Sequence, residues 1–278
     1  MHYHVTSISL TGLLPLLDDL LIDLLKSLSP EEWRAQTVAK HWKVKDAAAH
    51  LLDGNIRVLS MLRDGYQGES SSVSSYQDLV DFLNGLNADW VKAMKRVSPQ
   101  VLILLHELTG KAYCEYYASL DPMEKAVFPV AWAGESESLN WMHIAREYTE
   151  KWLHQQQIRE AVNRPALMAP MYLRPFIQVC MYALPYTFRD VKAKKGTIVA
   201  VTVTGDAEST WPIVYDGEKW YAYSGSSRAF VTEVIIGPDL AWKLFSKSLR
   251  PADAGDQVII KGNRELGEVA AGMVSFMA

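Results

Sequence analysis

The spacing of apolar residues divides the chain into a helical first half and a mixed second half. Leucines recur at three- and four-residue steps over residues 10–28, which predicts an amphipathic helix. The same period, with its start and stop signals, predicts four more helices, over about 44–62, 79–97, 99–119 and 139–162. Asn163-Arg164-Pro165 ends the last of these, because a residue before proline avoids helical geometry. Residues 163–170 are therefore interpreted as a link to a second domain.

Beyond residue 170, short runs of β-branched and aromatic residues replace the long helical pattern. A helical stretch over about 171–192 comes first, interrupted by Pro175 and Pro185. The runs that follow predict strands over 197–204, 211–215, 219–223, 230–236 and 257–260, and helices over 238–248 and 265–277. The sequence thus predicts a helical bundle over 1–165 and a smaller α/β domain over 170–278.

Composition and charge narrow the classes of function. The formal net charge is -4, which gives no bulk attraction to nucleic-acid phosphates or to anionic membranes. There is no uninterrupted apolar run of about 18 residues and no signal-peptide pattern, so we expect a cytoplasmic protein without a membrane span. The two cysteines, Cys114 and Cys180, form no C-x-x-C pair, which argues against a disulfide framework or a cysteine-built zinc site.

Three side chains could bind a metal ion. Glu150 and His154 are four residues apart in the last helix of the first half, so they leave the same face of that helix. His50 lies in the second predicted helix. Imidazole nitrogens and a carboxylate are the usual ligands of zinc, nickel or iron in a site with open positions. Helical bundles assemble metal sites in this way, from side chains on facing helices.

The same pattern has a plainer interpretation. A polar stripe runs along the last helix of the first half, formed by His143, Glu147, Glu150, His154 and Gln157. Apolar residues lie roughly opposite, so this stripe could simply face water. His50 could equally be a structural histidine. The spacing by itself leaves both interpretations open.

Two segments resemble a known family. W-K-V-K-D-A-A-A-H-L (42–51) and E-K-W-L-H-Q-Q-Q-I-R-E-A (150–161) are similar to the two signatures of the DinB-like fold, and most of all to its mycothiol-dependent maleylpyruvate isomerase branch. In the second half, G-D-x-x-x-x-W (205–211), D-G-x-x-W (216–220) and I-I-K-G-N-R-E-L (259–266) resemble the sterol-carrier-protein-like domain of that branch. The resemblance implies an up-down four-helix bundle followed by a smaller α/β, sterol-carrier-like domain.

The resemblance also implies a ligand set. In this branch a histidine of the second helix and an E-x-x-x-H pair of the last helix hold a divalent metal, which here implies His50, Glu150 and His154. Zinc is favoured, with nickel or iron as alternatives. Gln157 departs from the aspartate that the family usually has, which can alter metal affinity or ligand orientation.

Further residues are less specific. His143 and Glu147 lie on the same face as the pair and are rival ligands. The branch uses an arginine in its second domain; Arg250 is the nearest match and Arg228 the other, and either could be an ordinary surface charge.

The implied reaction needs a thiol from outside the chain. A cation strongly favours the thiolate form of a bound thiol, and the chain has no obvious cysteine nucleophile. The resemblance implies a low-molecular-weight thiol, mycothiol or else bacillithiol or glutathione. This thiol would serve cis–trans isomerisation of a small electrophilic substrate or be transferred to it, with Arg250 pairing with a substrate carboxylate. The competing hypothesis is a non-catalytic carrier that binds an apolar ligand in the C-terminal domain. The sequence leaves the oligomeric state open.

Overall fold

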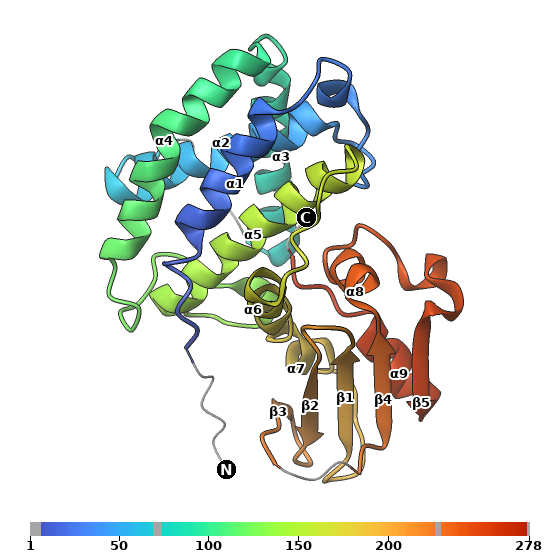
Figure 1. The fold of residues 1–278 in the computed structure, drawn as a ribbon. Coiled ribbons are helices and arrows are strands. Elements are labelled where there is room, and N and C mark those ends of the chain that lie inside the picture. The colour runs from blue at the N-terminus through green and yellow to red at the C-terminus, as the bar shows by residue number, and fades with distance from the viewer. Residues whose placement is uncertain (1–6, 69–73, 226–228, 277–278) are drawn as a thin grey trace. The chain divides into compact units, whose positions relative to one another are not determined.

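The computed structural model describes residues 7–68, 74–225 and 229–276, which fold into two compact units (Figure 1). The helical unit contains residues 8–129 and 137–167, and the mixed unit contains residues 130–136 and 168–276. Arg228 lies outside the described residues. Over the described part of the chain, every helix is too short or too polar to cross a membrane.

The helical unit has five long helices among its described residues: α1 (Leu14–Lys26), α2 (Val44–Arg57), α3 (Tyr76–Met94), α4 (Pro99–Ser119) and α5 (Asn140–Ala161). Helix α2 packs against α4 and α5, and α1 packs against the same two helices, so these four form a four-helix bundle. Helix α3 packs against α2. All five agree with the predicted helices. At the start of α4, for example, the Ser98 hydroxyl accepts a hydrogen bond from the Val101 amide, and Pro99 occupies the first turn.

The second predicted helix changes its winding before it ends. Regular α-helix stops at Arg57, and residues Val58–Arg63 form a π-helical segment. The amide of Asp64 accordingly donates to the carbonyl of Leu59, five residues back, at 3.0 Å. Such segments are rare and occur frequently at functional sites.

A buried ion pair lies inside the bundle. The Lys151 ammonium donates to Asn55 Oδ1 at 2.8 Å, lies 3.5 Å from Asp18 Oδ1 and sits 4.3 Å from the centre of the Tyr113 ring. Gly110 makes room for this arrangement, because a Cβ at that position would lie 1.9 Å from Asp18 Oδ2. The charges are therefore compensated within the core.

The mixed unit contains one five-stranded sheet among its described residues. Its strands are β1 (Ile198–Val203), β2 (Ser209–Tyr215), β3 (Trp220–Ala222), β4 (Thr232–Ile236) and β5 (Val258–Gly262). Their order is β3-β2-β1-β4-β5, with β1 and β4 parallel and the other neighbours antiparallel. The helices are α6 (Pro170–Cys180), α7 (Ala183–Thr187), α8 (Pro238–Phe245) and α9 (Arg264–Ala271). The predicted helical bundle followed by an α/β domain is confirmed.

The last helix ends earlier than predicted. The apolar pattern predicts a helix up to Met277, but α9 stops at Ala271. The residues after Gly272 turn back into the core instead. The Ser275 hydroxyl donates to the Cys180 carbonyl at 2.8 Å, and Phe276 stacks on Phe176 with ring centres 6.2 Å apart. Burial of the same apolar residues is achieved without a helix.

Candidate metal centre

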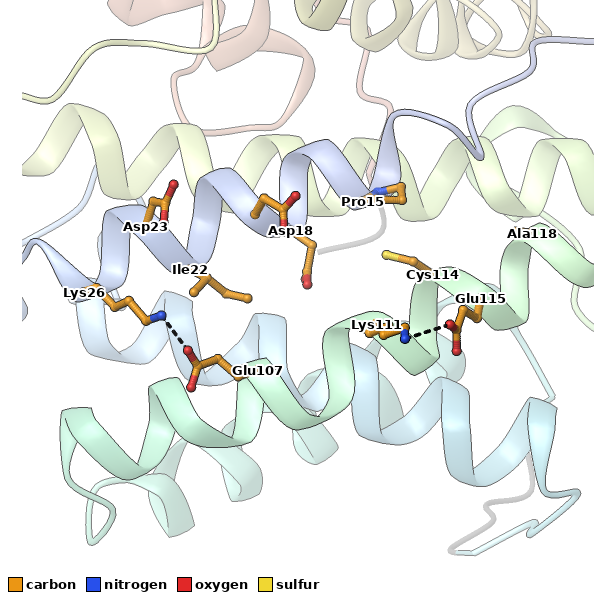
Figure 2. A pocket seen from close by; sticks show the side chains of 11 residues that line it. Pro15, Asp18, Ile22, Asp23, Lys26, Glu107, Lys111, Cys114, Glu115 and Ala118 are labelled. Atoms are coloured by element: carbon orange, nitrogen blue, oxygen red, sulfur yellow. Dashed lines mark ion pairs between the residues drawn. The ribbon is translucent and has the colours of Figure 1, made fainter.

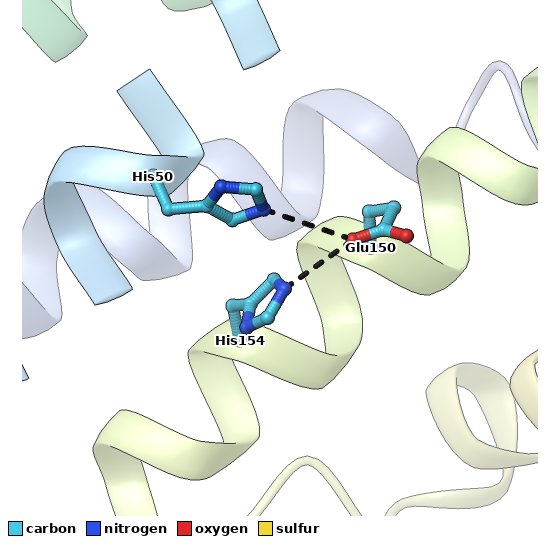
Figure 3. Close-up of side chains that lie close together, drawn as sticks. All are labelled: His50, Glu150 and His154. Carbon is cyan, nitrogen blue, oxygen red and sulfur yellow. Dashed lines mark ion pairs between the residues drawn. The ribbon is translucent and has the colours of Figure 1, made fainter. Parts of the chain in front are cut away.

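Helices α2 and α5 bring together the three predicted ligands (Figure 3). Nε2 of His154 lies 3.3 Å from Oε2 of Glu150, and Nε2 of His50 lies 3.9 Å from the same oxygen. One potential ligand atom from each residue lies within 4.8 Å of the others. The convergence follows from the i, i+4 spacing on α5 and from the packing of α2 against that face.

An indole holds the two imidazole rings. Trp42, directly before the N-cap residue of α2, lies 4.6 Å from the ring centre of His50 and 5.2 Å from that of His154. The two imidazoles are themselves 4.7 Å apart, edge to face. Packing therefore restricts the rotamers of both rings before any ligand binds.

Gln157 orients one ring by a hydrogen bond. Nδ1 of His154 lies 2.9 Å from Oε1 of Gln157, and both side chains are buried. With the proton assigned to Nδ1, the amide oxygen accepts and Nε2 keeps its lone pair for a metal. Gln157 thus provides the contact that an aspartate would provide, but without its charge. Nδ1 of His50 is buried and has no such partner among the described residues.

The local electrostatics favour the protonation states that bind metal. Burial lowers the pKa of His50 to about 4, so its imidazole is neutral at pH 7. Burial opposes ionisation of Glu150, but hydrogen bonds with His154 and His50 outweigh it and hold the pKa of the carboxyl well below its usual range. The centre therefore offers a neutral imidazole and a carboxylate at neutral pH.

The three side chains fit a divalent cation. Ligand atoms that are about 2.0–2.2 Å from a tetrahedral zinc ion are roughly 3.3–3.6 Å from one another. The Glu150–His154 separation of 3.3 Å is in this range, the Glu150–His50 separation of 3.9 Å is slightly wider, and the ligand atoms of the two histidines lie within 4.8 Å of each other. The Glu150 side chain is 35% exposed, which leaves an open side for a further ligand. Two imidazoles and one carboxylate suit zinc, nickel and iron alike.

The rival ligands belong to a different cluster. His143 Nε2 and Glu147 Oε1 both accept hydrogen bonds from Nη2 of Arg146, each at 2.6 Å. The Tyr113 hydroxyl donates to the other Glu147 oxygen at 2.9 Å. The interpretation of the polar stripe as a water-facing surface is wrong, because His143, Glu147, His154 and Gln157 are all less than a tenth exposed.

Arg250 lies in the mixed unit. It is exposed and directly precedes a short 3-10 turn, Pro251–Asp253, whose last amide donates to the Arg250 carbonyl at 2.9 Å. Its role toward a substrate stays a prediction.

A separate groove of about 790 Å³ lies between α1 and α4 (Figure 2). Five of its charged residues form ion pairs: Lys26 with Glu107, Lys111 with Glu115, and Asp18 with the buried Lys151. None of the three candidate ligands lines it. Cys114 borders this groove, but burial raises the pKa of its thiol to about 12, and burial likewise raises the pKa of Cys180. Neither thiol is an activated nucleophile.

Comparisons with known proteins identify the family and the fold. The family model of the mycothiol maleylpyruvate isomerase N-terminal domain matches residues 14–159. Crystal structures of a mycothiol-dependent maleylpyruvate isomerase and of a point mutant of it have the same fold, each with a TM-score of 0.53 at 10% sequence identity. Each alignment covers 90% of this chain and 91% of the other. No match was found among curated proteins.

Proposed function

Because the chain belongs to the family of the mycothiol maleylpyruvate isomerase N-terminal domain, we propose that it is a metal-dependent enzyme that uses a low-molecular-weight thiol. Its reaction is either cis–trans isomerisation of a maleylpyruvate-type substrate or transfer of the thiol to a small electrophile. The observation that carries the proposal is the convergence of His50, Glu150 and His154 on one point with an open side. Mycothiol is the favoured thiol, with bacillithiol and glutathione as alternatives.

Each residue has a defined task in this proposal. His50, Glu150 and His154 hold the metal, for which zinc is favoured. A divalent cation supplies one effect when bound: it lowers the pKa of a coordinated thiol so that the thiolate is present at neutral pH. Trp42 and Gln157 keep the imidazoles in position. Since Cys114 and Cys180 are both buried, the nucleophile comes from outside the chain. Arg250 pairs with a substrate carboxylate, and the protein acts in the cytoplasm.

The carrier hypothesis is the alternative. It requires an apolar ligand bound in the mixed unit and gives no role to the convergence of three metal-binding side chains. Membership of the isomerase family favours the enzyme.

A spectroscopic experiment separates the two functions. Cobalt replaces the native metal, and mycothiol, bacillithiol and glutathione are added in turn. An enzyme gives a sulfur-to-cobalt charge-transfer band that persists well below the free thiol's pKa of about 8.5. Glu150→Ala weakens this band, whereas Arg250→Gln spares it and reduces turnover. Arg264→Gln, which changes another exposed arginine of the mixed unit, is the matched control. If none of the thiols changes the spectrum while a fatty acid or sterol binds, the carrier hypothesis replaces the enzyme.

A further inference from the structure

A glycine without a packing reason lies beside the candidate centre. Gly54 is inside α2, one turn after His50, and therefore on the same helix face. Glycine is less favourable than alanine inside a helix, so it needs a cause. Gly110 has one, because Asp18 fills the position of a Cβ. At Gly54 an added Cβ meets no described atom within 4 Å beyond its chain neighbours and the adjoining helix backbone, and the backbone there is ordinary α-helix. Open space thus adjoins the ligands.

Two arginines lie along the faces that carry the ligands. Arg57 follows Gly54 by three residues on α2, and Arg146 precedes Glu150 by four residues on α5. Arg57 is seven residues, about two helical turns, after His50, and Arg146 is about one turn before Glu150, so both lie on the same helix faces as the candidate ligands.

Both arginine side chains are held in place and remain partly exposed. Nε of Arg57 lies 3.3 Å from Oδ2 of Asp53, and Arg146 is fixed by Glu147 and His143. Their side chains are 34% and 22% exposed. A fixed guanidinium with free N–H groups suits a carboxylate, because it donates two parallel hydrogen bonds without losing much side-chain entropy. The π-helical segment directly after Arg57 changes the helix winding at the same end of α2.

We propose that the open space at Gly54 is a subsite for a carboxylate of the electrophilic substrate, which Arg57 and Arg146 bind next to the metal ligands. This inference rests on the proposed function and adds a specificity determinant to it: the bundle itself selects anionic over neutral electrophiles. Arg250 keeps the role proposed for it above, toward another carboxylate of the substrate.

The test fills the space and removes the donors. Gly54→Leu places a side chain where the carboxylate would bind. Gly85→Leu is its matched control, since Gly85 is also inside a helix, α3, with no atom within 4 Å of an added Cβ. Both substitutions improve helix propensity and should raise the Tm of the full-length protein by about 2–4 °C. Arg146→Gln and Arg57→Gln remove one donor each, and the more exposed Arg57 remains informative if the Arg146 variant does not fold.

The probe is malonate, with malonamide as its neutral isostere, measured by calorimetry on zinc-loaded protein without thiol. We expect Gly54→Leu and either arginine variant to bind malonate at least about tenfold more weakly, with zinc content unchanged and with little effect on malonamide. Gly85→Leu should bind malonate like the wild type. In turnover assays the substrate KM should rise while the thiol KM is unchanged.

Two outcomes overturn the inference. Malonate affinity that is equal in all variants means that the carboxylate contacts the metal alone. A rise in the thiol KM, seen only with a carboxylate-bearing thiol such as glutathione, assigns the subsite to the thiol and not to the substrate. Failure of the proposed function is recognised separately, because the cobalt spectrum then fails to respond to thiols even in the wild type.

Discussion

Replacing Gln157 with alanine tests whether the hydrogen bond to His154 tunes the centre. The substitution removes the oxygen that lies 2.9 Å from Nδ1 of His154 and leaves a buried N–H without this acceptor. Loss of a partner of this kind lowers metal affinity by about 10–100-fold, which corresponds to about 1.4–2.8 kcal/mol. Gln157→Asp should act in the opposite direction, because a carboxylate acceptor makes the imidazole a stronger ligand.

The measurement is a zinc competition titration against a chromophoric chelator, with Gln155→Ala as the matched control. Gln155 is also buried on α5, but its amide donates to the Leu17 carbonyl at 2.8 Å, away from the ligands. Both alanine variants should lose stability, by about 1–3 kcal/mol. Only Gln157→Ala should lose metal affinity. Equal zinc affinities in the wild type and Gln157→Ala would show that this hydrogen bond does not orient a ligand, and equal losses in both variants would reduce the effect to general destabilisation.

Two further predictions concern stability. If zinc is bound at a free concentration of about 1,000 times its Kd, removing it with excess EDTA should cost about 4.1 kcal/mol and lower the Tm by roughly 8–16 °C; His154→Ala should abolish this response, and an unchanged wild-type melting curve would contradict tight binding. Lys151→Met should cost about 3–5 kcal/mol at pH 7 in urea unfolding, because it strands Asp18 in the core. Burial already raises the pKa of Asp18 despite Lys151, and losing the cation raises this pKa further. The loss of unfolding free energy should therefore shrink as the pH falls toward about 4 and grow as the pH rises. Asp18→Asn in the same chain should recover most of this loss, and a loss that does not depend on pH would disprove this account.

Local signals made the elements predictable. Ser98-Pro99 carries both a cap and a first-turn proline, and α4 begins there. Asp216-Gly217 marks a tight turn, and Gly217 has a φ of 109°, which glycine adopts without strain. The end of α9 was not predictable in this way, since Met273 and Phe276 are buried whether or not the helix continues. Periodicity reports which residues avoid water, and it does not report where a chain turns back to achieve this.

The candidate centre could be predicted only in part from periodicity, because it also depends on which helices pack against α5. A polar stripe on a helix indicates a solvent-exposed face only when no other element packs against it. Helices α1 and α2 pack against α5, which is buried along almost its whole length. The spacing within α5 therefore places Glu150 and His154 side by side, but a three-ligand site also needs His50, which lies on another helix, α2. The subsite at Gly54 is harder still to infer from sequence, because the observation behind it is open space beside a glycine. A glycine in a helix looks the same in sequence whether a neighbour fills the position of its Cβ, as Asp18 does at Gly110, or nothing does. Only the arrangement of the helices separates the two cases, and only the second leaves room for a substrate.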